Sequence, residues 1–135
     1  MIIKKNKLSG FTLLELLIVI FIIAIISTLA YVSMENARAR ARDARRLADV
    51  YMIRQALNYY KEVEGGYPVN LSEPPQPFSG PSGKIYLSPM PSDPKTKQPY
   101  SYSLLVDDKY RLVFNLERET NDYLAGENII ISLEE

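Results

Sequence analysis

A long stretch of this sequence, from Phe11 to Glu64, contains neither proline nor glycine, the two residues that most often interrupt a helix. All nine prolines lie instead between Pro68 and Pro99. This division predicts one long helix, and the glycine pair that follows Glu64 supplies its stop signal. Pro68 then prevents the helix from resuming.

The first half of this predicted helix, Leu16 to Met34, has no charged side chain and is about as long as a helix that crosses a bilayer. Its apolar residues face every direction, which does not fit a soluble helix with one buried stripe. We therefore predict that residues 11–34 form a transmembrane or polymerisation helix. Glu15 is the one acid inside it, and such a charge costs about 2.5–3.5 kcal/mol at the bilayer centre. Its place near one end lowers that cost, and the positive end of the helix dipole would favour it.

The second half of the predicted helix is amphipathic. Apolar residues recur there at helical spacing and form one stripe, which comprises Leu47, Val50, Ile53, Leu57 and Tyr60. Alternating runs at residues 100–106 and 110–116 predict two strands joined by a turn at 107–109, and a run at 129–133 predicts a third strand after a polar loop. We expect an antiparallel sheet to cover the helical stripe, since neither surface is stable in water alone.

The strand alternation also predicts which side chains face the helix. They are Tyr100, Tyr102, Leu104 and Val106 in the first strand, and Tyr110, Leu112, Phe114 and Leu116 in the second. The segment 67–99 is interpreted as an ordered surface loop, with disorder as the alternative that its composition allows. Its residues available for packing are Tyr67, Phe78, Ile85, Tyr86 and Leu87. The fold class is therefore α+β, with residues 35–135 as one globular domain that includes the amphipathic half of the helix.

Composition argues against an enzyme. Histidine and cysteine are both absent, which removes the commonest general base, the commonest transition-metal ligand, thiolate catalysis and disulfides. Basic and acidic residues both number 16, so the formal net charge is zero and no nucleic-acid partner is expected. The arginines between 38 and 46 are expected to hold lipid phosphates or to pair with nearby acids such as Glu35, Asp43 and Asp49.

The stretch KLSGFTLLELLIVIFIIAII, from Lys7 to Ile26, closely resembles the prepilin (class III) signal of type IV pilins, competence pilins and type II secretion pseudopilins. This resemblance implies that a membrane aspartyl peptidase, the prepilin peptidase, cuts after Gly10 and methylates the new terminal amine of Phe11. Residues 1–10, with their lysines, would then be a cytoplasmic leader peptide.

The same resemblance implies a role for Glu15 in subunit assembly. In the family, the acid of one subunit is thought to neutralise the terminal amine of its neighbour, here that of Phe11, as helices pack in the filament core. Pairing is the usual way in which a charge persists in an apolar setting. The two groups also lie about one helical turn apart in one chain, so the sequence allows the pair in either geometry.

The resemblance extends to residues 41–68 and 86–102, and the lack of cysteine favours the pseudopilin or minimal-pilin branch. Pseudopilins of the major type often bind calcium in a late loop. Oxygen-bearing residues occur there in this chain, namely Glu119, Asn121, Asp122, Glu127 and Asn128. Their spacing matches no defined site, so a solvated polar loop is the preferred interpretation and no cofactor is expected.

Together these features predict a structural subunit of a type IV pilus-like filament or type II secretion pseudopilus, with a pilin-like fold. The subunit would cross the bacterial inner membrane once, with its head on the non-cytoplasmic side, before joining a periplasmic or surface filament. Its expected partners are identical or homologous subunits, the prepilin peptidase, an inner-membrane assembly platform and membrane lipids. The alternatives are an exported binding domain or small enzyme with an ordinary secretory signal cut after Ala30, and an uncut signal anchor.

Overall fold

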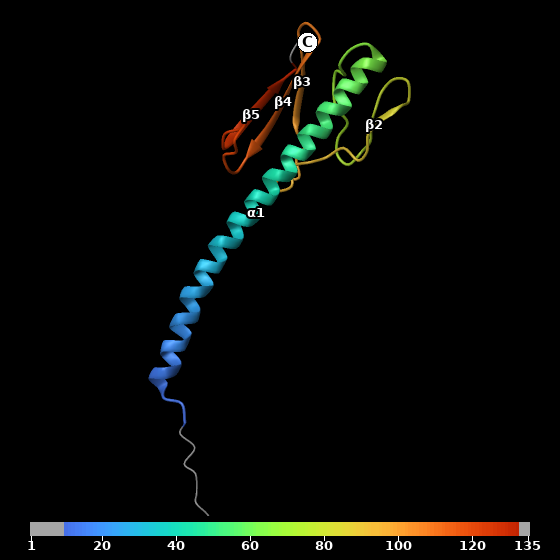
Figure 1. Cartoon of the computed structure of the whole chain (residues 1–135). Helices are drawn as coiled ribbons and strands as arrows, with labels where there is room; N and C mark the ends of the chain where they lie inside the picture. Colours follow the sequence, from blue (N-terminus) through green and yellow to red (C-terminus); the bar gives the residue numbers. More distant parts are fainter. Residues whose placement is uncertain (1–9, 133–135) are drawn as a thin grey trace, which may run out of the picture. The chain divides into compact units, whose positions relative to one another are not determined.

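The computed structural model describes residues 10–132, along which one long helix precedes several short strands (Figure 1). The elements are α1 (Leu13–Glu64), β1 (Phe78–Ser79), β2 (Ile85–Leu87), β3 (Ser101–Leu105), β4 (Lys109–Leu116) and β5 (Gly126–Ile131). The predicted α+β class, with a long amino-terminal helix and a small antiparallel sheet, is confirmed.

Helix α1 runs without interruption through the stretch that lacks proline and glycine. It begins at Leu13, two residues after the predicted start, and ends at Glu64 as predicted. Gly65 follows with a φ of 88°, and its N–H donates to the carbonyl oxygen of Lys61 (2.9 Å). Only a residue without Cβ adopts this left-handed conformation at little cost, so the glycine closes the helix.

The chain divides into two compact units, one that ends at Ala37 and one that begins at Arg38, and α1 contributes to both. In the first unit, every residue from Gly10 to Met34 is exposed. This part of α1 is long and apolar enough to cross a membrane, judged by length and composition.

The second unit has its core between the later half of α1 and the three-stranded sheet. The sheet has the order β3-β4-β5 and both of its strand pairs are antiparallel. The predicted helical stripe packs in this core, and Ile53 and Leu57 are almost completely buried. Every second residue of β4 faces the same core, with Leu112 fully buried. Each such side chain contributes about 1.5–3 kcal/mol by leaving water.

The predicted inward face of the first strand is only half correct. Tyr100 is buried and Tyr102 packs against the core, but Leu104 and Val106 are exposed. Val106 lies in the turn between β3 and β4, which occupies residues 106–108 rather than 107–109, and is 82% exposed; Leu104 lies within β3, opposite Tyr110, and is 37% exposed. Two consecutive aspartates, Asp107 and Asp108, adopt positive φ in this turn, so the strand alternation stops at Leu105.

The third strand is also displaced from its predicted position. It begins at Gly126 instead of Ile129, because Gly126 to Asn128 pair with residues 114–116 of β4. The predicted polar loop is therefore shorter than expected. Leu133, the last residue of the predicted strand, lies outside the described residues.

The proline-rich segment is ordered, as predicted, and the alternative of disorder is wrong. It contains a small two-stranded antiparallel sheet, β1 with β2, that the sequence did not indicate. Phe78 is buried in the core, and Tyr67, Tyr86 and Leu87 pack against it. Ile85, however, is 58% exposed and does not take its predicted place in the core.

Candidate processing and assembly site

The start of α1 is fixed by the side chain of Thr12. Its hydroxyl oxygen accepts the backbone N–H of Glu15 (3.2 Å), and its carbonyl oxygen accepts the N–H of Leu16 (3.2 Å). These contacts make Thr12 the N-cap, the residue that satisfies a backbone donor left unpaired at a helix start. A threonine followed three residues later by glutamate has the spacing of a capping box.

The two residues predicted for processing lie just before this cap. Gly10 and Phe11 are both exposed and non-helical, and the Phe11 side chain is 75% exposed. A Cβ built on Gly10 would meet no described atom within 4 Å. The peptide bond between these residues is thus uncovered within the described part of the chain.

Glu15, predicted for subunit assembly, is exposed in the first turn of α1. The backbone N–H groups at a helix start carry partial positive charge, which favours a carboxylate there. The structure therefore places Gly10, Phe11 and Glu15 at one helix end, and their roles in processing and assembly stay predictions.

Apart from Glu15, residues 13–34 of α1 present an exposed apolar surface on all sides of the helix, with exposed fractions of the large apolar side chains between 41% at Val19 and 82% at Leu13. The hydroxyl of Thr28 donates to the carbonyl oxygen of Ile25 (2.7 Å), so this polar group is satisfied inside the helix. Such a surface requires lipid or other apolar helices as its surroundings.

A second polar site, in the other compact unit, is centred on Arg46, whose side chain is only 3% exposed. Its Nε donates to Asp93 Oδ2 (2.6 Å), and its Nη1 donates to Asp43 Oδ1 (2.7 Å) and to Glu117 Oε1 (2.9 Å). The sequence predicted lipid phosphates or nearby acids such as Asp43 as partners of the basic run, and the pair with Asp43 is present within the chain. The partners at Asp93 and Glu117 were missed, because they lie 47 and 71 residues away in the sequence.

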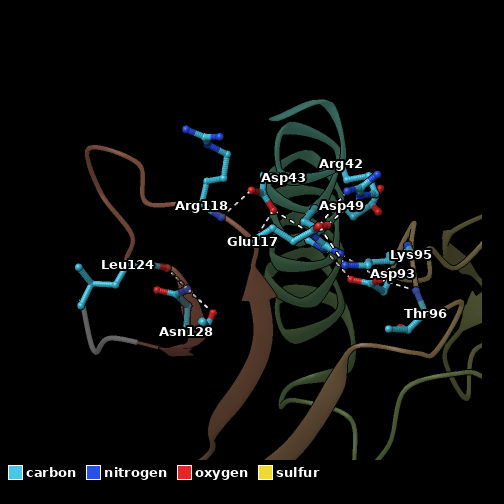
Figure 2. Close-up of polar contacts among 12 residues, drawn as sticks. Arg42, Asp43, Asp49, Asp93, Lys95, Thr96, Glu117, Arg118, Leu124 and Asn128 are labelled. Carbon is cyan, nitrogen blue, oxygen red and sulfur yellow. Dashed lines mark hydrogen bonds and ion pairs between the residues drawn. The ribbon is translucent and has the colours of Figure 1, made fainter. Parts of the chain in front are cut away.

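Glu117 forms ion pairs with three basic side chains, and its contacts are drawn in Figure 2. Arg42 donates to its two carboxylate oxygens (2.7 and 2.8 Å), Arg46 donates to Oε1, and Lys95 Nζ donates to Oε2 (3.1 Å). The hydrogen bonds from Arg42 are the main cause of a pKa for Glu117 well below its usual range.

Asp93 gains comparable support from its own loop. Burial opposes its ionisation, but the bonds from Arg46 and from the backbone N–H groups of Thr96 and Lys95 outweigh that effect and hold its pKa well below the usual range. Asp43 accepts the N–H groups of Glu117 and Arg118 (2.9 and 3.0 Å), just after β4. Helix, loop and strand end are thus joined by paired charges.

Near this cluster, Asp49 is buried, and its Oδ2 accepts a hydrogen bond from the Tyr100 hydroxyl group (2.9 Å). Burial raises the pKa of Asp49, and the hydrogen bond from Tyr100 only partly opposes that shift. Asp49 therefore ionises less readily in the folded chain than in water.

The loop predicted as a possible calcium site is held by its own hydrogen bonds. Asn128 Nδ2 donates to the carbonyl oxygens of Leu124 and Gly126 (2.9 and 3.0 Å; Figure 2), so this amide group closes the loop. Among residues 10–132, no group of three metal-binding acids is placed to hold an ion. That this is a solvated polar loop without a cofactor stays a prediction.

Comparison with known proteins gives two matches. The family described as the prokaryotic N-terminal methylation motif matches residues 5–31, which include the capped helix start. Type II secretion system core protein G of Aeromonas hydrophila is 30% identical over 101 residues, which cover 67% of this chain and 70% of that protein. No solved structure gives a significant match.

Proposed function

Because this chain belongs to the family of type IV pilins and type II secretion pseudopilins, we propose that it is a structural subunit of a type II secretion pseudopilus. The observation that carries this proposal is the exposed apolar surface of residues 13–34, directly after a helix start that matches the methylation motif. The 30% sequence identity with a type II secretion protein favours the pseudopilus over a surface pilus. The work of such a subunit is mechanical rather than catalytic.

Processing is the first step of the proposed function. The prepilin peptidase cuts between Gly10 and Phe11, releases residues 1–10 and methylates the new amine. Exposure of this peptide bond supports the assignment. The apolar part of α1 stays attached to the product, so the subunit remains in the inner membrane with its head on the non-cytoplasmic side.

Assembly follows when the apolar helices of identical or homologous subunits leave lipid and pack together at the assembly platform. The new ammonium at Phe11 and the carboxylate of Glu15 are then both in an apolar setting. Each charge needs an opposite charge, and in the filament the Glu15 of one subunit meets the Phe11 amine of its neighbour. Exposure of both residues at one helix end is compatible with this contact.

The intact mass of the protein from the membrane fraction tests processing. A product that begins at Phe11 and carries one added methyl group is expected. A product that begins at Tyr31 would instead show an ordinary secretory signal, and retention of Met1 would show an uncut anchor. Either result would overturn the proposal.

Two substitutions separate processing from assembly. Gly10→Val should leave the full-length chain in the membrane, because the residue before the cut is then branched. Glu15→Gln should still be cut but should form no filaments by electron microscopy, with Glu35→Gln as the control outside the apolar segment. Filaments of normal length from Glu15→Gln would refute the charge pair.

A further inference from the structure

We propose that Thr12 is a positioning residue for the cleavage reaction: its hydroxyl fixes the start of α1 at Leu13 and so keeps the Gly10–Phe11 peptide outside the helix. This inference rests on the proposed cut after Gly10. Its geometric basis is the 3.2 Å bond from the Glu15 N–H to the Thr12 hydroxyl oxygen, with non-helical backbone at residues 10–12.

A peptidase needs the scissile carbonyl group unpaired. Inside a helix, the carbonyl oxygen of residue i accepts the N–H of residue i+4, so that of Gly10 would be occupied by Leu14. Cleavage would then require local unfolding first, and the cleavage rate would fall in proportion to the small population of the unfolded helix start. With the cap at Thr12, the first such acceptor is the carbonyl oxygen of Thr12 itself.

The sequence contains a competing start signal. Ser9 is also a good N-cap residue type, and it stands three positions before Thr12. A helix capped by Ser9 would have Gly10 and Phe11 as its first two helical residues, with the scissile bond inside the first turn. The choice between the two caps therefore decides whether the bond is accessible.

Two physical effects favour the later start. A glycine inside a helix costs about 1 kcal/mol relative to alanine, and a start at Ser9 would include Gly10. The cap at Thr12 also places the acid of Glu15 in the first turn, where the helix dipole favours a negative charge. A start at Ser9 would put uncharged Thr12 at that position.

Thr12→Val tests this directly, since valine keeps the branched shape but has no acceptor oxygen. Loss of an N-cap is worth about 1 kcal/mol, so cleavage of the full-length chain by prepilin peptidase in proteoliposomes should slow about five-fold. Thr12→Ser and Thr12→Asn, which retain a capping oxygen, should be cut at close to the wild-type rate.

Ser9→Ala provides the matched control and a second test. As a single substitution it should leave the cleavage rate unchanged. The double variant Ser9→Ala/Thr12→Val should recover most of the rate lost in Thr12→Val, because no cap at residue 9 then stabilises a helix that includes the Gly10–Phe11 bond. Slow cleavage of Thr12→Asn would show that the peptidase recognises threonine itself. That result, or a wild-type rate for Thr12→Val, would overturn the inference.

A readout without the peptidase comes from the backbone chemical shifts of Gly10 and Phe11 in detergent micelles. They should move toward helical values in Thr12→Val and return in the double variant; shifts that stay at their wild-type values in Thr12→Val would contradict the inference. Absence of any cut at Gly10 in the wild-type chain would instead refute the proposed function. Equal cutting of all variants at that bond would refute only the role of Thr12.

Discussion

Arg46 and Asp93 lie 47 residues apart in the sequence, yet the Nε of the arginine and the Oδ2 of the aspartate are 2.6 Å apart. The bond joins α1 to the loop before β3, and the arginine side chain is only 3% exposed. Buried charged groups are stabilised by their ion-pair partners rather than by hydration. The stability of the second compact unit should therefore depend on this arginine.

Arg46→Met should lower the free energy of unfolding by about 3–5 kcal/mol, because it leaves several acids facing one another without their shared cation. Urea unfolding followed by circular dichroism measures the change. The matched control is Lys61→Met, since Lys61 pairs with Asp108 at a site where both side chains are more than 40% exposed. That variant should lose at most about 1 kcal/mol. Equal losses would contradict the assigned role of Arg46.

Stability should fall in acid because the pKa of Asp93 and that of Glu117 are lower in the folded than in the unfolded chain. Such groups stabilise the fold above their unfolded pKa of about 4, and this stabilisation is lost as the pH falls toward the folded values. Asp93→Asn should be less stable than wild type at pH 7, and the difference should shrink toward pH 3. Parallel stability curves for the two proteins would rule out this linkage.

Asp49 should behave in the opposite way, since burial raises its pKa. An acid of this kind destabilises the fold once the pH rises above its unfolded pKa of about 4, and the cost grows until the pH exceeds the folded pKa, so Asp49→Asn should gain stability relative to wild type as the pH rises above about 4. Tyr100→Phe, by contrast, removes the hydroxyl that donates to Asp49 and should cost about 1–3 kcal/mol at pH 7. Unfolding curves across this pH range test both statements, and a pH-independent Asp49→Asn effect would disprove the first.

Gly80→Ala should lower the thermal midpoint, because the new Cβ would press against Glu64 Oε1 and the ring of Tyr86. The Glu64 carboxylate accepts hydrogen bonds from the hydroxyl groups of Ser82 and Tyr86. These bonds join the end of α1 to the β1–β2 segment. In a Glu64→Ala background the same substitution should cost clearly less, since one of the crowded groups is gone. An identical cost in both backgrounds would place the strain elsewhere.

The elements set by local pattern were predictable from the sequence. The end of α1 follows from the glycine pair after Glu64, and the buried face of β4 follows from strict alternation around Leu112. The capping role of Thr12 was missed, although the three-residue spacing of Thr12 and Glu15 is a known helix-start signal that could have revealed it. Each of these features depends on residues that are close in the chain.

The features that were not predicted depend on backbone geometry or on distant partners. Val106 has an apolar side chain and the correct alternation, yet the positive φ values of Asp107 and Asp108 place it in a turn. Which arginine of the basic run would be buried was equally hidden, because Arg46 is selected by Asp93 and Glu117, far along the chain. The local sequence pattern does not indicate which distant residues pair with one another.

The shared carboxylate of Glu117 has an evolutionary consequence. Because three cations from two segments converge on one acid, a lineage that loses the acid inherits a surplus of positive charge and should soon replace Arg42 and Lys95 as well. Descendants are thus expected to keep this constellation whole or to discard it whole, and its members should covary across relatives.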